Sequence, residues 1–397
     1  MSLMERAVRS APQPPATVKA PAEKFKASPR LALLDGLRFF AAIMVLLYHY
    51  TAWHHGFWGT STAQETWPTL SKVSMFGNLG VQLFFIISGF VIMLSAYGKS
   101  ASRFIGSRIS RLYPAYWVAV FATGILVIKI WPQMGDGRTF KDLLANLSMF
   151  HPAMGVRHID GVYWTLWVEM KFYILILVLM LLGVMTKRAI TILAVAWPLL
   201  GVADHLFNNG AQATLLMSQY SALFAGGIML FMIYKFGHSA LRWIILAMNV
   251  VIAAYFTGIT ASAEAEELTN YSVEPWTYWI IVGSLYALLA LLTLTPLRRI
   301  QFKSLAIAGA LTYPVYLLHQ VWGWWLISKL TGVFGQLPGG KYLTLAIVIA
   351  TVLGAAYLVH RFVERSMAKP LGTAVTRLID GAVSKVGKKL SALLPLR

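Results

Sequence analysis

The sequence predicts an all-α membrane protein, a polytopic helical bundle of about ten transmembrane helices. Of its 397 residues, 58% are hydrophobic and only 12% are charged. Ordinary soluble domains carry about twice that charged fraction. Apolar runs recur along the whole chain, and most are close to the ~20 residues that a helix needs to cross the hydrocarbon core. Because lipid offers no hydrogen bonds to a bare backbone, helices are the expected conformation of these runs.

The basic residues follow the order of these apolar runs. The runs lie at roughly 39–53, 79–96, 113–130, 164–184, 189–203, 214–234, 241–258, 276–294, 305–328 and 342–360. Most of the 34 lysines and arginines fall in the two tails and in the connections that follow the even-numbered runs. The positive-inside rule therefore predicts a multi-pass protein of the cytoplasmic (inner) membrane with both termini in the cytoplasm. The net charge of +19 is then a consequence of topology and of anionic lipid, and no nucleic-acid partner is expected.

Composition divides the chain into three parts. Residues 1–30 are rich in Pro, Ala and Lys and are expected to form a disordered, basic cytoplasmic tail. One membrane domain is expected at 31–366. Residues 367–397 form a basic cytoplasmic tail in which apolar residues recur at helical spacing, which indicates an amphipathic helix on the inner leaflet or, alternatively, a frayed solvated tail. The chain has no cysteine, so disulfide and thiol chemistry are excluded.

One ionisable residue precedes the first apolar run and a second lies within it. In "RFFAAIMVLLYH" (38–49), Arg38 and His49 are eleven residues apart and share one helix face, about 16 Å apart along the axis. Asp35 lies one turn before Arg38 and could pair with it. An ionisable residue inside a membrane is a functional candidate. The alternative is an arginine that reaches the inner interface and a histidine in the outer head-group zone.

A carboxylate lies early in the fourth run. In "YWTLWVEMKFY" (163–173) the predicted helix enters from the outside, so Glu169 is expected at about the depth of His49. A carboxylate beside an imidazole stabilises the protonated ring, which suits a general base. The alternative is that Glu169 pairs with a neighbouring lysine such as Lys171 and fixes helix packing. Tyr163 and Trp164 in the same stretch are further candidates for the site.

The first basic connection contains an Arg-x-x-Arg sequence. In "SRFIGSRISRLYPAYW" (102–117), Arg108 and Arg111 lie on one face of a helix. The planar guanidinium fork suits phosphate oxygens, so the pair could hold a phosphate group on the cytoplasmic side. The alternative is an anchor that only sets the topology.

Two further runs contain single polar residues. His319 lies in the middle of the ninth run, in "TYPVYLLHQVW", and read alone is a structural histidine. Ser88 and Gly89 in "LFFIISGFV" permit close approach of a neighbouring helix. The outward histidines lack the spacing of a zinc site, so no metal is expected.

Together these stretches resemble the acyltransferase-3 family of integral membrane acyltransferases. The resemblance covers roughly residues 31–366 and consists of five motifs in the family's order. They are the Arg-x10-His of run one, "FFIISGF", "RISRLYPAYW", "WTLWVEMKFY" and "YPVYLLHQ".

The resemblance implies transfer of an acyl group, commonly acetyl, from cytoplasmic acyl-CoA to a hydroxyl of an extracytoplasmic glycan or glycolipid. It implies that His49 is the catalytic histidine, Arg38 its motif partner, and Glu169 the acid of the fourth-run motif. Arg108 and Arg111 match the positions expected to hold the CoA phosphates. Some relatives carry a fused soluble domain, and this chain has only about 30 residues after its last run, so it is expected to act alone or with a separate partner.

Several alternatives stay open from the sequence. His49 could act as a general base or carry the acyl group itself, and Arg38 could hold the pantetheine arm or the thioester carbonyl. A transporter of a lipid-linked sugar or small solute is the rival function, and the Arg-x-x-Arg sequence argues for the enzyme. Acceptor identity and oligomeric state are open. The tryptophans of the outward loops, Trp53, Trp58, Trp67, Trp131 and Trp164, could stack on sugar rings or form an ordinary interfacial belt.

Overall fold

The computed structural model describes residues 31–207 and 216–393, with side chains up to residue 385. Within these ranges the chain forms helices and contains no strand, which confirms the all-α prediction. The long helices are α1 (Ala32–Thr51), α4 (Gly80–Ala96), α5 (Ala101–Ile125), α8 (Trp164–Leu181), α9 (Lys187–Leu206), α11 (Ser221–Phe236), α12 (Ala240–Thr269), α13 (Pro275–Leu294), α14 (Lys303–Phe334), α15 (Gly340–Val359) and α16 (Arg365–Leu393). The predicted disorder of residues 1–30 lies outside the described residues.

Short helical segments join the long helices. They are α2 (Ala63–Thr66), α3 (Ser71–Ser74), η1 (Met75–Leu79), the π-helical η2 (Leu126–Ile130), α6 (Pro132–Gly135), α7 (Phe140–Asn146), η3 (His151–Met154), η4 (Gly161–Tyr163), η5 (Pro296–Arg299) and the π-helical η6 (His360–Glu364). The turns η3 and η4 connect α7 to α8, and η6 connects α15 directly to α16.

Eight helical segments in the described part of the chain are long and apolar enough to cross a membrane. Two of the ten predicted runs are not among them. The run at 214–234 forms α11, which has 16 residues and is buried without a break from Ser221 to Ile233. It is hydrophobic all round because other helices enclose it. The run at 305–328 belongs to α14, a 32-residue helix whose buried residues include His319 and Gln320.

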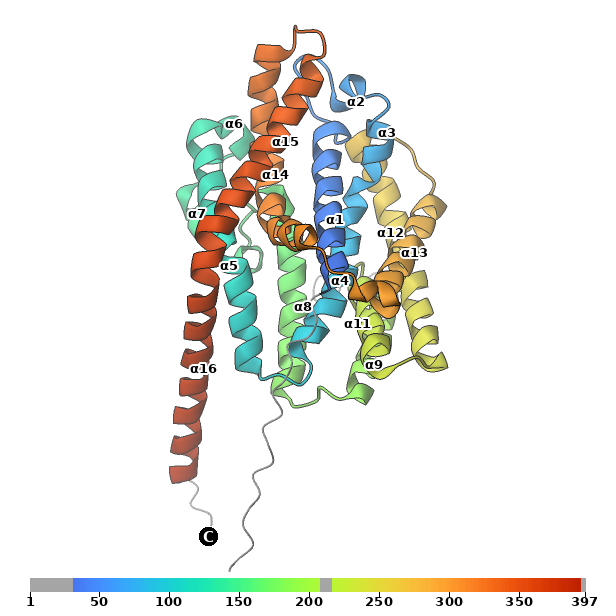
Figure 1. Cartoon of the computed structure of the whole chain (residues 1–397), viewed down its shortest axis with the longest axis vertical. Helices are drawn as coiled ribbons and strands as arrows, with labels where there is room; N and C mark the ends of the chain where they lie inside the picture. The colour runs from blue at the N-terminus through green and yellow to red at the C-terminus, as the bar shows by residue number, and fades with distance from the viewer. Residues whose placement is uncertain (1–30, 208–215, 394–397) are drawn as a thin grey trace, which may run out of the picture. The chain divides into compact units, whose positions relative to one another are not determined.

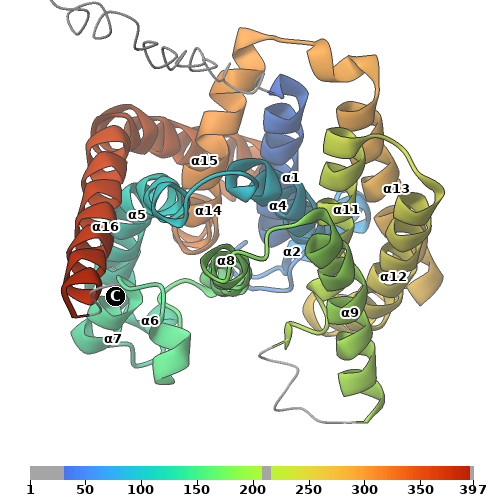
Figure 2. The ribbon, with the colours of Figure 1, turned by 90° about the horizontal axis from the view of Figure 1, so that it is seen from below.

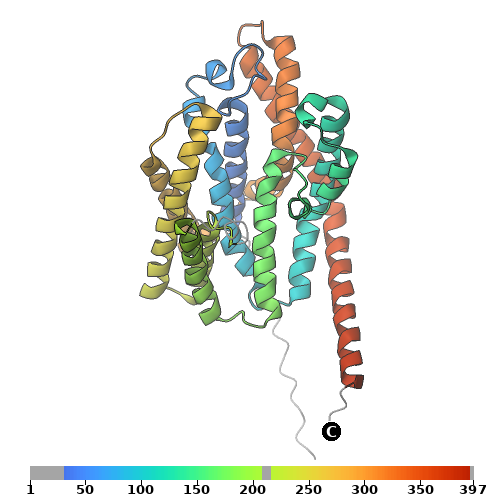
Figure 3. The same cartoon turned by 180° about the vertical axis from the view of Figure 1, so that it is seen from behind.

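Two of the basic connections and the basic C-terminal helix reach one end of the bundle, whereas the α13–α14 connection lies nearer its middle (Figure 1). Figures 1 and 3 show the α4–α5 and α8–α9 connections and the last turns of α16 at the lower end. The α14–α15 connection and the segments α2 and α3 lie at the opposite end. This arrangement agrees with the alternation of charge in the sequence. We refer below to the two ends as the basic end and the opposite end.

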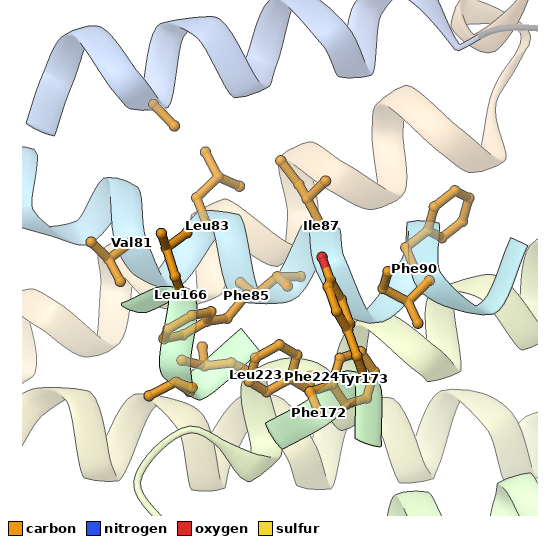
Figure 4. Packing of buried hydrophobic residues seen from close by; sticks show 14 of the residues in the cluster. Val81, Leu83, Phe85, Ile87, Phe90, Leu166, Phe172, Tyr173, Leu223 and Phe224 are labelled. Atoms are coloured by element: carbon orange, nitrogen blue, oxygen red, sulfur yellow. The ribbon is translucent and has the colours of Figure 1, made fainter. Parts of the chain in front are cut away.

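The core is built where α4, α8 and α11 meet. Side chains from all three helices interdigitate there (Figure 4). Phe224 of α11 lies between two aromatic neighbours, with its ring centre 4.9 Å from that of Phe85 and 4.4 Å from that of Phe172. Offset aromatic packing of this kind adds to the free energy gained from area burial alone.

Helices α4 and α11 touch through their backbones. A Cβ atom at Gly89 would overlap the carbonyl oxygen of Phe224, and one at Gly227 would overlap the carbonyl oxygen of Ile86. Only glycine fits at either position, so the predicted close approach of a helix at Gly89 is confirmed.

The segment between the predicted runs at 113–130 and 164–184 is folded against α5. Tyr113, Tyr116 and Trp117 of α5 donate hydrogen bonds of 2.8, 2.8 and 3.1 Å to the carbonyl oxygens of residues 148, 146 and 147. These residues end α7, so the aromatic side chains of "YPAYW" satisfy the carbonyls that the helix leaves unpaired. The motif therefore has a structural role beside its neighbouring arginines.

The C-terminal segment is helical, as its spacing predicted, and it packs along α5. Gly372 and Thr376 of α16 face Gly106 of α5, and Thr376 donates a hydrogen bond of 3.5 Å to the carbonyl of Ser102. The continuous helical segment Gly340–Lys385 has 46 residues. A straight helix of that length measures about 69 Å, more than the ~40–45 Å thickness of a whole bilayer, so part of the segment must extend beyond it.

We expect Gly89→Ala to lower the apparent melting temperature of the detergent-purified protein, because the new methyl group must displace the backbone of α11. Gly354→Ala in α15 is the matched control, since no atom lies within 4 Å of its added Cβ. Alanine is favoured over glycine by about 1 kcal/mol inside a helix, so the control should keep or raise the melting temperature. Equal melting temperatures for the two variants would show that the α4–α11 contact can adapt.

Candidate functional site

The structure brings His49 of α1 and His319 of α14 into direct contact. Nε2 of His319 lies 3.2 Å from Nδ1 of His49. Both side chains are enclosed, with 6% and 0% of their surface exposed. From the sequence alone His319 was interpreted as a structural residue. Its partner is found 270 residues earlier in the chain, so no local pattern could have indicated the pair.

The hydrogen bonds assign the ring tautomers. Nδ1 of His319 lies 2.8 Å from the carbonyl oxygen of Tyr316, so this nitrogen carries the hydrogen and Nε2 of the neutral ring is an acceptor. Nδ1 of His49 lies 2.8 Å from the carbonyl oxygen of Val45, so it is the donor both to that carbonyl and to His319. The lone pair of His49 is therefore left on Nε2, the nitrogen that a proton acceptor or nucleophile would use.

Aromatic and polar groups hold this ring in place. The ring of Trp53 is stacked on that of His49, with 5.1 Å between centres and 23° between planes. The carbonyl oxygen of His49 accepts hydrogen bonds from Nε1 of Trp324 at 2.8 Å and from Nε2 of His55 at 3.1 Å. The hydroxyl of Tyr50 donates to the carbonyl of His319 at 2.6 Å. Both histidines are thus fixed through their backbones as well as their rings.

His55 is itself neutral. The backbone N–H of Phe57 donates to its Nδ1 at 3.2 Å, which leaves the ring hydrogen on Nε2 for the bond to His49. Burial lowers the pKa of His55 to about 4. At neutral pH this residue therefore donates to the backbone of His49 without adding a positive charge beside it.

The tryptophans of the outward loops lie in different surroundings. Trp58 is buried and donates to the carbonyl of Tyr50 at 2.8 Å, and Trp67 packs edge-on against it. Trp131 packs against Phe57, 5.2 Å between ring centres. Trp53 is the one of the five that contacts the ring of His49 in the described structure.

A second group of candidates lies further towards the basic end, around a cavity of about 50 Å³. Arg38, Glu169, Thr165 and Tyr316 contribute polar groups to its walls. A cavity of this volume has room for a few water molecules. Ser88 of α4 donates a hydrogen bond of 2.6 Å to the carboxylate of Glu169, which gives Ser88 a polar role beside that of its glycine neighbour.

The expectation that Glu169 lies at the depth of His49 is wrong. Glu169 faces the Arg38 cavity, and Arg38 lies about 16 Å along α1 from His49. The cause is the start of α8, which lies inside the bundle. The backbone N–H of Val162 donates to Oε1 of Gln320 at 3.2 Å, so the turn before α8 is level with the residue after His319. Counting helical turns from the membrane surface therefore places Glu169 too far out.

Asp35 and Arg38 remain on the same face of α1. The Asp35 side chain packs against Gly309 of α14, where an added Cβ would overlap it. Both Asp35 and Glu169 are close enough to Arg38 for attractive electrostatic interaction, and Arg111 is close enough for repulsion. The half-buried Arg38 is thus surrounded by charges of both signs.

The two arginines of the Arg-x-x-Arg sequence interact with each other and with Tyr173, and each has further neighbours of its own. Arg108 lies against α8, with its guanidinium carbon 5.7 Å from the ring centre of Tyr173, and lines a second cavity of about 180 Å³. Arg111 interacts electrostatically with Arg38 and with Glu364 of η6. Arg108 therefore lines the α5–α8 cavity and also interacts electrostatically with Glu169 and Arg111, whereas Arg111 interacts with Arg38.

The remaining candidates lie outside the cavities. Lys171 lies over the ring of Trp167, 5.7 Å from its centre. Tyr163 is buried and its hydroxyl donates to the carbonyl of Leu317 at 3.4 Å. Trp164 is 37% exposed and packs against Tyr220. The predicted roles of these three residues are not supported by contact with the histidine pair.

Tyr316 separates the Arg38 cavity from the histidine pair. It lines that cavity, and its ring centre lies 5.5 Å from that of His319. Its hydroxyl bonds to Oγ1 of Thr165 at 2.7 Å and to the carbonyl of Val162 at 3.1 Å. Tyr316 stands one turn before His319 in "YPVYLLHQ", and no local pattern marked it as a site residue.

Asp160 is a second residue that the sequence analysis missed. It is 1% exposed and accepts hydrogen bonds from the backbone N–H groups of Val162 and Val321 at 3.2 and 3.5 Å. Burial raises its pKa to about 7. Asp160 joins the turn before α8 to α14, two residues beyond His319.

Comparison with known proteins assigns the family. Residues 31–360 match the family model of the acyltransferase domain, acyltransferase 3. The chain belongs to the acyltransferase-3 family. The resemblance inferred from its motifs is thereby confirmed. The family match includes α1 to α15 and ends in η6, so α16 lies beyond it.

Two curated proteins are similar to this chain over shorter stretches. "Acyltransferase MdmB" of Streptomyces mycarofaciens is 28% identical over 151 residues, which are 36% of this chain and 38% of that protein. "Putative peptidoglycan O-acetyltransferase YrhL" of Bacillus subtilis (strain 168) is 28% identical over 178 residues, which are 39% of this chain and 25% of that protein. The similarity thus covers less than half of either relative. No solved structure matches the chain.

We expect hydrogen exchange in residues 151–159 to be faster at pH 5 than at pH 7, after correction for the intrinsic rate. His151 Nε2 and His158 Nδ1 lie 2.8 Å apart, and burial lowers the pKa of each ring to about 4. A histidine with a lowered pKa contributes stability that is complete above pH 6.5 and is lost as the pH falls towards 4. Exchange mass spectrometry on the purified protein measures this opening.

The pH difference in exchange should shrink in His158→Gln and persist in His54→Gln. His54 is exposed and hydrogen-bonds to Asn270, so it serves as the control. The stability contributed by Asp160 depends on pH in the opposite direction, because its raised pKa makes it stabilising at low pH. Asp160 is unchanged in both variants. If the His158 variant keeps the full pH difference, the histidine pair does not control this segment.

Proposed function

We propose that this chain is a membrane acyltransferase that moves an acyl group, commonly acetyl, from cytoplasmic acyl-CoA to a hydroxyl of an extracytoplasmic glycan or glycolipid. Membership of the acyltransferase-3 family supports the reaction class. The observation that carries the proposal is the histidine pair, in which His49 keeps a lone pair on Nε2. The names of the two relatives, an acyltransferase and a peptidoglycan O-acetyltransferase, agree with it.

His49 is proposed to activate the acceptor. Its Nε2 takes the proton of the acceptor hydroxyl while the oxygen forms a bond to the thioester carbonyl carbon. The carbon–sulfur bond then breaks, and the CoA sulfur leaves with the proton that His49 returns. His319 and the carbonyl of Val45 both accept from Nδ1–H, so they favour the protonated ring that this step creates. Attack by Nε2 on the thioester, to form an acyl-histidine, would use the same lone pair.

The donor is proposed to enter from the basic end. Arg108 and Arg111 lie at this end of α5 and would bind the CoA phosphates through charge-assisted hydrogen bonds. Arg111 is close to Arg38, and the Arg38 cavity reaches Tyr316 beside the histidine pair. The uncharged pantetheine arm would follow this order of residues, with Tyr316 displaced to admit it.

The position of Arg38 limits its role. About 16 Å of α1 separate it from His49, too far for one guanidinium to hold the thioester carbonyl at the imidazole. Of the two roles considered from the sequence, we therefore assign it the donor arm. Glu169, held by Ser88, would balance the charge of Arg38 in the cavity when no donor is present.

The transporter alternative gives no reason for the histidine pair. A transport pathway needs polar groups that contact the solute, whereas both ring nitrogens of His319 form hydrogen bonds within the protein. The rings of Trp53 and His49 are stacked at the end of α1 that faces away from the basic connections. A sugar ring of the acceptor could stack on Trp53 there.

We expect His49→Gln to lower transfer of radiolabelled acetyl from acetyl-CoA to envelope material by about 10²–10⁴-fold, the usual contribution of a general base. Inverted membrane vesicles expose the basic end to added acetyl-CoA under the proposed topology. His54→Gln is the control, because that residue is exposed and contacts Asn270 instead of His319. Full activity of the His49 variant would exclude both the base and the acyl-histidine.

We expect Arg108→Gln combined with Arg111→Gln to raise the KM for acetyl-CoA by about tenfold or more, since a hydrogen bond to a charged group contributes about 1.5–3 kcal/mol. The preference among acceptors should stay the same. Arg188→Gln with Arg299→Gln removes the same charge from exposed positions elsewhere on the basic side. Equal KM values in the two double variants would mean that Arg108 and Arg111 only set the topology.

A further inference from the structure

A groove of about 340 Å³ lies between α5 and α16, towards the basic end. Basic and hydroxyl side chains line it from both helices. They are Arg103, Ser107 and Ser110 of α5, and Lys369, Thr373, Thr376 and Arg377 of α16. This groove is distinct from the Arg38 cavity and from the α5–α8 cavity of Arg108, with which it shares no lining residue.

The close approach of the two helices gives the groove its floor. A Cβ at Gly106 would overlap the side chain of Thr376, and one at Gly372 would lie 3.0 Å from the side chain of Ser110. Larger residues here would push the helices apart. The basic side chains therefore line the groove at a spacing that is fixed by contact between the two backbones.

The three cationic groups of the groove have no anionic partner in the described structure. Arg103, Lys369 and Arg377 are exposed, and none of their side chains forms an ion pair or hydrogen bond with another described residue. Asp380, one turn beyond Arg377, forms no ion pair with it. Like charges held together without a counter-ion raise the free energy of the protein, and binding of an anion would lower it.

The chemistry of the groove suits a phosphate group. Arginine forks and a lysine provide charge-assisted donors. The hydroxyls of Ser110, Thr373 and Thr376 donate to backbone carbonyls of their own helices, whereas that of Ser107 accepts from Arg108 and keeps its hydrogen for a further oxygen. Exposed apolar side chains precede the groove in the same helical segment, on the side away from the basic end, with Phe362 65% and Met367 39% exposed. Figure 2 shows α16 at the edge of the bundle beside α5. A ligand here would meet cationic groups and apolar surface together, as a phospholipid at the inner interface does.

We propose that the α5–α16 groove binds the head-group phosphate of an anionic phospholipid of the inner leaflet. The acyl chains would lie along the exposed apolar residues of the helical segment. Because α5 also carries Arg108 and Arg111, the bound lipid would hold α16 against the helix that faces the proposed donor route. This inference depends on the membrane topology and is independent of the proposed reaction.

Native mass spectrometry of the delipidated full-length chain, titrated with dioleoyl-phosphatidylglycerol, tests the proposal. Arg103→Gln, Lys369→Gln and Arg377→Gln together should weaken the tightest lipid binding by roughly a hundredfold, given the usual contribution of a basic residue near anionic lipid. Thr373→Trp keeps all three charges and fills the groove, so it should weaken binding as well. The matched control removes Arg188, Lys235 and Arg299, which are exposed basic residues outside the groove.

Two results would overturn the proposal. Equal phosphatidylglycerol binding in the groove variant and the matched control would show that net charge alone attracts the lipid. Displacement of the lipid by excess CoA, but not by dephospho-CoA, would assign the groove to the 3′-phosphate of the nucleotide. With dioleoyl-phosphatidylcholine, binding should be weak and the same for all variants.

Discussion

The hydrogen bond between His49 and His319 joins the first helix of the bundle to α14 and determines which ring nitrogen is free. Each of its ends is fixed by a carbonyl of the preceding turn, Val45 on α1 and Tyr316 on α14. Both anchor carbonyls are backbone groups, so the tautomers depend on the helices as well as on the side chains. A small rotation of either helix would break the contact. The packing of α1 against α14 is therefore a requirement of the proposed chemistry.

The histidine pair and the group around Arg38 lie at different depths in the bundle and have different proposed roles. The histidine pair, with the stacked ring of Trp53, lies where α1 ends away from the basic connections. Arg38 lies about 16 Å further along α1, at a cavity that Glu169 also lines, and Ser88 donates to Glu169. A thioester donor is long and carries its charge at one end only. Cationic groups at one depth and a neutral imidazole at another suit such a molecule better than a single compact site would.

The sequence predicted what depends on composition and local spacing. Long apolar runs gave the all-α bundle, and Gly89 gave a close helix contact, because these properties need no knowledge of distant partners. The predicted depth of Glu169 was wrong, because α8 begins inside the bundle, where the backbone N–H of Val162 bonds to Gln320 of α14. His319 was interpreted as a structural histidine because its partner lies far away in the sequence. One sequence contains no pattern that indicates a contact between residues 270 positions apart. The family motifs that contain these two histidines can be recognised in it.

Helix α5 contacts α8, the region of Arg38 and η6, and α16. One face packs Arg108 against α8, a second directs Arg111 towards Arg38 and η6, and a third forms the basic groove with α16. Its outer half is held by hydrogen bonds from Tyr113, Tyr116 and Trp117 to the end of α7. With that half fixed, movement of α5 at the basic end is opposed mainly by its contacts with α8, α14 and α16. Because α16 lies beyond the family match, the groove adds a restraint on α5 that the matched domain does not itself contain. A ligand in the groove would therefore act on the arginines of the proposed donor route through the helix that carries them, without touching the histidine pair.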